Sequence, residues 1–104
     1  MPDGSRVEQR VRRDFPEPGA REIMRVLDEL PGAAGYSEEM LGSERVRAAI
    51  VLLSHGRLRS FHAAVKLALT DWRDLLVLAG LAEADWPARL DAALGPASAV
   101  RAGH

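Results

Sequence analysis

The chain of 104 residues contains no cysteine and no asparagine, few aromatic residues and almost no net charge. Without cysteine, disulfide frameworks, thiol catalysis and thiolate zinc sites are excluded. The 14 basic and 15 acidic residues give a formal net charge of −1 and are spread along the whole sequence. Such a chain has no long-range field that would gather phosphates or acidic ligands, so its charge identifies no partner.

Long hydrophobic runs are also missing. The longest, 48–53 and 75–79, fall far short of a bilayer span, and the first five residues lack the apolar region of a signal peptide. We therefore expect a cytoplasmic protein without a membrane partner. All but one of the 14 basic residues are arginine, and alanine is abundant. This composition is typical of proteins encoded by GC-rich bacterial genomes.

Hydrophobic residues at helical spacing account for most of the remaining signal. Hydrophobic residues of all kinds make up 47% of the chain and charged residues 28%, as in ordinary globular domains. Ser5 and Glu8 form a capping box that predicts the start of a first helix, which Pro16 and Pro18 end. Two ion pairs at four-residue spacing are predicted on its solvent side: Glu8 with Arg12, and Arg10 with Asp14.

The clearest amphipathic helix covers residues 20–30. Breakers from Pro31 to Gly35 predict a connection after it. Residues 36–41 could form one short turn of helix, and we interpret them as a loop. Its inward positions follow the spacing i, i+3, i+4 and i+7: Ile23, Val26, Leu27 and Leu30.

A helix that is apolar nearly all round follows Ser43 and is predicted to be the central one, ending at Gly56 in the left-handed conformation. The apolar pattern resumes from residue 58 to Thr70, which is predicted to cap a further helix that Gly80 ends. Asp85 is predicted to cap the last helix, with Pro87 in its first turn. No window alternates in the manner of a strand.

The fold class expected from these signals is all-α: a small single-domain bundle of five to six helices over residues 1–96, with a frayed tail over 97–104. Trp72 and Trp86 are predicted to be mostly buried core anchors.

One part of the chain resembles a group of short, uncharacterised bacterial helical proteins. The resemblance covers about residues 44–95 and is carried by the stretches 44–49, 56–58, 71–77, 79–81 and 85–87, which include Asp71-Trp72 and Asp85-Trp86-Pro87. It implies no activity and no functional residue.

Catalytic and metal sites are not indicated by the residue pattern. His55 and His62 stand seven positions apart with Gly56 between them, and no third ligand is suitably spaced to complete a metal site. The carboxylates have simpler roles as helix caps or surface groups, and no glycine-rich phosphate loop is present. We therefore expect no enzymatic activity, no cofactor and no small-molecule substrate.

A nucleic-acid-binding helix-turn-helix is the alternative hypothesis, because residues 63–71 followed by 72–81 have suitable lengths. The would-be recognition helix offers Asp71 and Asp74 in its first turns, although base reading needs arginine, lysine, asparagine or glutamine there. Arg57, Arg59 and Lys66 are the cations that could line one side of such a site.

The favoured hypothesis is a protein-interaction or accessory module, acting on a protein partner or by self-association. After the inward positions of residues 72–81 are assigned, apolar side chains remain on the opposite side of that helix. Burial on both sides would explain them, whereas an exposed surface would offer an interface. The candidate interaction surface consists of three residues at four-residue spacing: Arg73, Val77 and Leu81.

Overall fold

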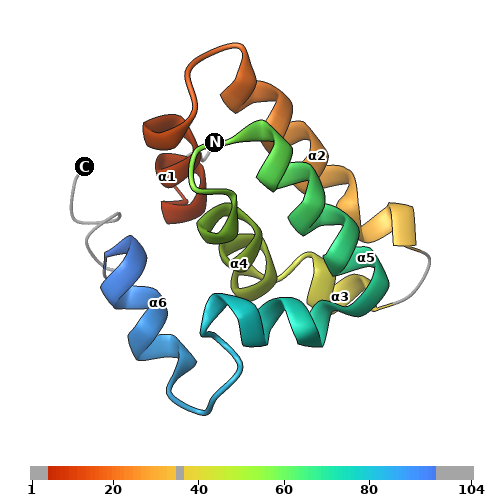
Figure 1. Cartoon of the computed structure of the whole chain (residues 1–104), viewed down its shortest axis with the longest axis vertical. Coiled ribbons are helices and arrows are strands. Elements are labelled where there is room, and N and C mark those ends of the chain that lie inside the picture. Colours follow the sequence, from red (N-terminus) through yellow and green to blue (C-terminus); the bar gives the residue numbers. More distant parts are fainter. Residues whose placement is uncertain (1–4, 35–36, 96–104) are drawn as a thin grey trace.

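One helix, α4 (Glu44–Ser54), lies in the middle of the molecule, and the other helices surround it (Figure 1). The computed structural model describes residues 5–34 and 37–95, and these residues form six helices and no strand. The all-α prediction is therefore confirmed, whereas the predicted tail over 97–104 lies outside the described residues. The other helices are α1 (Arg6–Asp14), α2 (Gly19–Ala34), α3 (Glu38–Leu41), α5 (Leu58–Ala79) and α6 (Trp86–Leu94).

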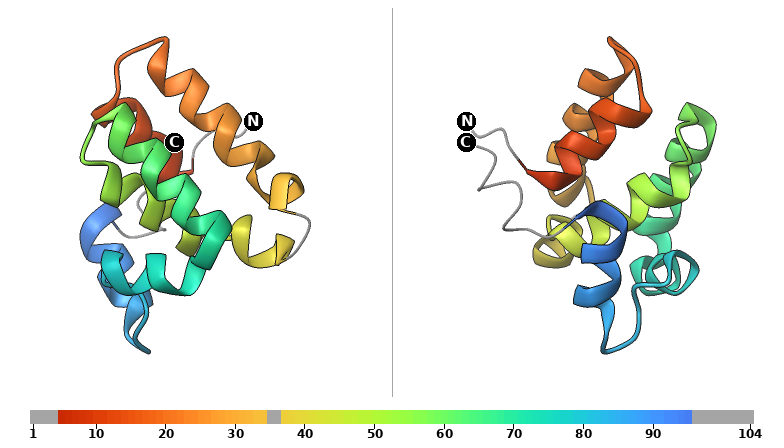
Figure 2. Two further views of the ribbon diagram at one scale, coloured as in Figure 1. Left: turned by 45° about the vertical axis from the view of Figure 1, so that its right-hand side comes forward. Right: turned by 90° about the vertical axis from the view of Figure 1, so that its left-hand side faces the viewer.

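The core forms around α4 because this helix is apolar on nearly every side, as predicted. Its most extensive contacts are with α5, and it also packs on α1 and α3. Figure 2 shows the same arrangement from two further sides, with α6 lying beyond α4 from α2. The buried residues of α4 are Val46, Ala48, Ala49, Ile50, Val51 and Ser54.

Side-chain caps fix the beginnings of two helices where the sequence predicts them. The hydroxyl of Ser5 accepts a hydrogen bond from the Glu8 backbone N–H at 3.0 Å, and that of Ser43 accepts one from Val46 at 3.2 Å. Both bonds satisfy a donor that the first turn of a helix leaves unpaired. The two predicted ion pairs on α1 are also present: Glu8 with Arg12, and Arg10 with Asp14.

The prediction that α2 ends before Pro31 is wrong, because the helix continues through this proline to Ala34. Leu30, which precedes it, is buried in the core. The Pro31 ring packs beside Gly42 at the end of α3, 3.2 Å from where a Gly42 Cβ would lie. These tertiary contacts outweigh the local tendency of proline to end a helix. The segment 36–41, interpreted as a loop, contains the short helical turn that its sequence also allows, α3.

Residues 58–79 form two helical halves, as predicted, and together they carry the label α5. The halves meet at a kink at Asp71, whose φ of −160° and ψ of 87° are not helical. The predicted cap, Thr70, instead donates its hydroxyl to the Lys66 carbonyl oxygen at 2.8 Å. The Asp71 carboxylate caps the second half of α5 by accepting from the N–H groups of Arg73 and Asp74, at 3.2 and 3.3 Å.

The two tryptophans are mostly buried, as predicted, and they pack against the core at its edge. Each is covered on one face by an arginine: Arg73 lies 5.3 Å from the Trp72 ring centroid, and Arg45 lies 4.8 Å from that of Trp86. A guanidinium over an indole face is attracted by its quadrupole, so these tryptophans use one face for packing and the other for a cation.

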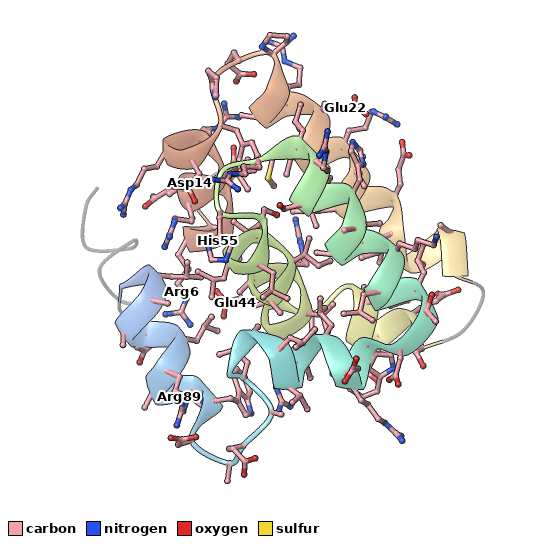
Figure 3. All side chains as sticks on the ribbon, in the orientation of Figure 1. Arg6, Asp14, Glu22, Glu44, His55 and Arg89 are labelled. Atoms are coloured by element: carbon pink, nitrogen blue, oxygen red, sulfur yellow. The ribbon has the colours of Figure 1, made fainter. Side chains whose placement is uncertain are left out.

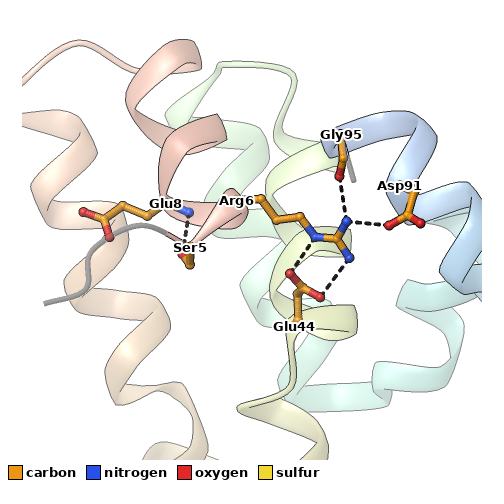
Figure 4. A network of polar contacts seen from close by, with 6 residues as sticks. All are labelled: Ser5, Arg6, Glu8, Glu44, Asp91 and Gly95. Carbon is orange, nitrogen blue, oxygen red and sulfur yellow. Dashed lines mark hydrogen bonds and ion pairs between the residues drawn. The ribbon is translucent and has the colours of Figure 1, made fainter. Parts of the chain in front are cut away.

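Arg6 joins three helices that are distant in sequence (Figure 4). From α1 it donates two hydrogen bonds to Glu44 on α4, one to Asp91 on α6 and one to the carbonyl oxygen of Gly95 after α6. The Arg6 side chain is 7% exposed, whereas Glu44 and Asp91 stay about half exposed. Hydrogen bonding to Glu44 raises the pKa of Arg6 against the opposing effect of burial. The fold therefore fixes α6 through a permanently charged arginine.

Candidate interaction surface

Two large apolar side chains stand side by side in solvent on the second half of α5. Val77 is 62% exposed and Leu78 is 61% exposed. The possibility that this helix is buried on both sides is thereby excluded, because its outer side faces water. We call the exposed residues of this half, Arg73, Asp74, Val77 and Leu78, the α5 outer face.

The structure brings together two of the three residues predicted for the interaction surface. Arg73 and Val77 are exposed on the α5 outer face, but Leu81 is 1% exposed and belongs to the core. Gly80 ends the helix in the left-handed conformation, with φ of 77°, so the chain turns inward before Leu81. The expectation that Leu81 faces outward is therefore wrong, and Leu78 takes its place.

The α5 outer face is held on a rigid support. On the opposite side of the same half, Leu75 and Leu76 are buried in the core. The turn that follows is fixed by Arg45, whose Nε donates to the Leu81 carbonyl oxygen at 2.9 Å. The backbone that carries the exposed Val77 and Leu78 is thus held by the core and by this hydrogen bond. A partner would therefore order little backbone on binding.

Charged residues precede and follow this apolar pair in the sequence. Arg73 precedes it, and exposed Glu83 follows it in the connection to α6. Within residues 5–34 and 37–95 neither Arg73 nor Glu83 forms an ion pair, although Arg73 stacks on Trp72. Asp74 lies in the first turn of the second half of α5, where the helix dipole favours a negative charge. An apolar centre with a charged rim is the composition of a protein interface.

A second apolar feature was not predicted from the sequence. The connection between α1 and α2 and the start of α5 line an open groove of about 680 Å³, with Leu58 47% exposed on one wall. Phe15 also lines the groove and is only 3% exposed. The sequence offers one signal for this groove, which is the apolar residue Leu58 in the first turn of a helix. The charged lining residues are Glu17, Arg21, Glu22 and Arg25.

The histidines do not come together with other ligands. His55 and His62 are both exposed, and His55 ends α4 with a positive φ of 49° on the side of α1 (Figure 3). Among the described residues, no group of three or more histidine or acidic side chains is placed to hold a metal ion. Asp85 pairs with Arg89 on the surface of α6 at 2.9 Å, which leaves it a structural role.

At the position where a helix-turn-helix would have its turn, α5 has a kink. The two halves of α5 meet at the kink at Asp71 and run in different directions (Figure 1). The first turns of the second half present the carboxylates of Asp71 and Asp74, which phosphates would repel. Arg57, Arg59 and Lys66 are exposed, but they lie in and before the first half.

Comparison of this chain with protein families, with curated proteins and with solved structures gave no match. None of the helices in the described part of the chain combines the length and the apolar character needed to cross a membrane.

Proposed function

We propose that the protein is a non-catalytic, cytoplasmic interaction module that binds another protein chain through the α5 outer face. The observation that supports this proposal most directly is the adjacent exposure of Val77 and Leu78, at 62% and 61%, on a helix whose inner side is fixed in the core. Exposing two neighbouring large apolar side chains to water is unfavourable for an isolated chain, and covering them with a partner removes that cost.

The groove beside Leu58 supports the proposal less well. It exposes one large apolar side chain where the α5 outer face exposes two, and two of its charged residues already pair with each other, Glu22 with Arg25. An interface depends on a central apolar cluster that excludes water. We therefore assign the contact to Val77 and Leu78.

Site-specific photo-crosslinking in the native cell tests the proposal. A photoreactive amino acid is placed at Leu78 in one variant and at Ala63 in the control, because Ala63 is also exposed and lies on the first half of α5. We expect discrete protein adducts from position 78, absent from position 63 and lost when Val77→Asp is added. Equal labelling from both positions, or no adduct from position 78, would show that the α5 outer face is not a contact surface.

A further inference from the structure

We infer that the groove beside Leu58 is a second binding site, which holds a small amphipathic anion: a single carboxylate on an apolar body. The site lies at the other end of α5 from the α5 outer face and does not depend on the proposed function. Two observations carry the inference: the apolar lining of the groove, and the pairing of every charged side chain in its described lining except that of Arg21.

The groove has the size and the lining of a small-molecule site. Its volume of about 680 Å³ falls within the roughly 300–1,000 Å³ of pockets that bind drug-sized ligands. Apolar surface comes from Phe15, Pro16 and Pro18 in the connection between α1 and α2, and from Leu58 on α5. Leu58 is 47% exposed, so an apolar ligand in the groove would remove this side chain from water.

The groove is built on backbone that is already fixed. Gly56, which lines it, has a positive φ of 74°, and a Cβ at this residue would lie 3.3 Å from the Asp14 carbonyl oxygen. The turn before α5 therefore approaches the end of α1 more closely than another residue type would allow. Phe15, the next residue of the lining, is anchored in the core at 3% exposure. The ligand thus enters a site that exists before binding.

The two acidic residues of the lining are already engaged through both of their carboxylate oxygens. Glu17 accepts a hydrogen bond from Arg12 Nη1 at 2.8 Å and another from the Arg21 backbone N–H at 3.2 Å. Glu22 accepts from Arg25 on both oxygens, with 3.1 Å between Arg25 Nε and Glu22 Oε1. Neither carboxylate is therefore left to bind a cationic ligand.

Arg21 is the lining residue whose charge has no partner. The other lining arginine, Arg25, donates to Glu22 and also, through Nη1, to Glu29 at 3.0 Å. The exposed Arg21 side chain forms no ion pair and no hydrogen bond within residues 5–34 and 37–95. Arginine binds a carboxylate through two parallel N–H donors. The free charge at the groove therefore selects an anionic head group.

The ligand should carry one negative charge and no more. Hydrogen bonding to Arg25 lowers the pKa of Glu22, so this carboxylate is ionised at neutral pH. A doubly charged group such as a phosphate would place its second negative charge near Glu22 and Glu17, which would repel it. A monocarboxylate matches the single free cation, and its apolar body matches the wall formed by Leu58.

Octanoate below its micellar concentration is the probe, and two-dimensional amide NMR of the full chain measures its binding. We expect it to shift the amides of Arg21 and Leu58 and to leave those of Val77 and Leu78 in place. Octylammonium has the same apolar chain with the opposite charge, and acetate has the carboxylate without the chain. Each should bind about tenfold more weakly than octanoate, or weaker still.

Substitution of Arg21 separates its charge from the shape of the groove. Arg21→Gln should weaken octanoate binding about tenfold and leave the weaker binding of uncharged octanol unchanged. Arg13→Gln is the matched control, because Arg13 is 75% exposed on α1 and does not line the groove. It should bind octanoate as the wild type does.

Three results would overturn the inference. Octylammonium could bind as tightly as octanoate, or Arg21→Gln could leave octanoate binding unchanged. Groove amides that shift when the protein concentration is raised without octanoate would show that a second copy, and not a small anion, fills the groove. None of these results concerns position 78, whose crosslinking tests the proposed function, so the two failures are distinguishable.

Discussion

The guanidinium of Arg6 and the carboxylate of Glu44 are joined by two hydrogen bonds, of 2.8 Å from Nε and 3.1 Å from Nη2 (Figure 4). They lie 38 residues apart in the sequence, and the pair ties α1 to the central helix α4. The remaining donors of Arg6 reach Asp91 and Gly95, so the same side chain also fixes α6. Bidentate geometry of this kind is specific to arginine.

Removal of this arginine should destabilise the whole chain. Arg6→Ala is expected to lower the free energy of unfolding by about 2–3 kcal/mol, because charged hydrogen bonds and the packing of the side-chain stem are lost together. Glu44 and Asp91 stay half exposed and can be solvated, which limits the loss. Urea unfolding measures it.

Arg12 on the same helix provides the control for that measurement. It is 53% exposed and pairs with Glu8 and Glu17 on the surface. Arg12→Ala should change stability by less than about 1 kcal/mol, since exposed ion pairs contribute little. Equal effects of the two substitutions would contradict the structural role assigned to Arg6.

The pH dependence of an Arg6→Lys variant tests the charge of this network. Bonding to Glu44 raises the pKa of Arg6, so its contribution is present below the ordinary arginine pKa and persists through the alkaline range. A lysine has an ordinary pKa of about 10.4, so it loses its charge, and with it its contribution, within the alkaline range. The variant should therefore lose stability relative to the wild type above about pH 10. Parallel stability curves across that range would contradict this assignment.

Asp71 caps the second half of α5 in place of Thr70, and substitution should show it. Asp71→Ala removes the carboxylate that accepts from Arg73 and Asp74 and is expected to cost about 1 kcal/mol. Thr70→Ala removes a hydroxyl bonded to a carbonyl that the helix already uses, and should be nearly neutral. Thermal unfolding of the two variants compares them, and the reverse order would restore Thr70 as the cap.

The local signals of the sequence were sufficient for the beginnings of α1 and α4 and for the central position of α4. Ser5 and Ser43 act through bonds to residues three positions away, which a single sequence displays directly. The passage of α2 through Pro31 depends instead on its packing beside Gly42, and the Arg6 network depends on residues 38 and 85 positions away. Such contacts leave no periodic signal in the sequence.

The exposed side of α5 was predicted in part for the same reason. Four-residue spacing correctly placed Arg73 and Val77 on one side of a helix, because both lie within it. The spacing failed at Leu81, because Gly80 ends the helix and redirects the chain one residue earlier. The exposure of Val77 itself was left open by the sequence, since an apolar residue on a second helix side fits burial and an interface equally well.

Aspartate substitutions at Val77 and Leu81 should separate these two positions. Val77→Asp replaces a side chain that is 62% exposed and should change the free energy of unfolding by less than about 1 kcal/mol. Leu81→Asp places a carboxylate at a position 1% exposed, where an unpaired charge costs several kcal/mol. Circular dichroism on heating measures both. Unfolding of the Val77→Asp variant would show that this side of α5 is core.

Photo-crosslinking from Leu78 in the native cell tests most directly the central claim that the α5 outer face is a contact surface. The account predicts discrete protein adducts from position 78 that Val77→Asp abolishes and that the control position, Ala63, does not give. Equal labelling from both positions, or no adduct from position 78, would contradict it.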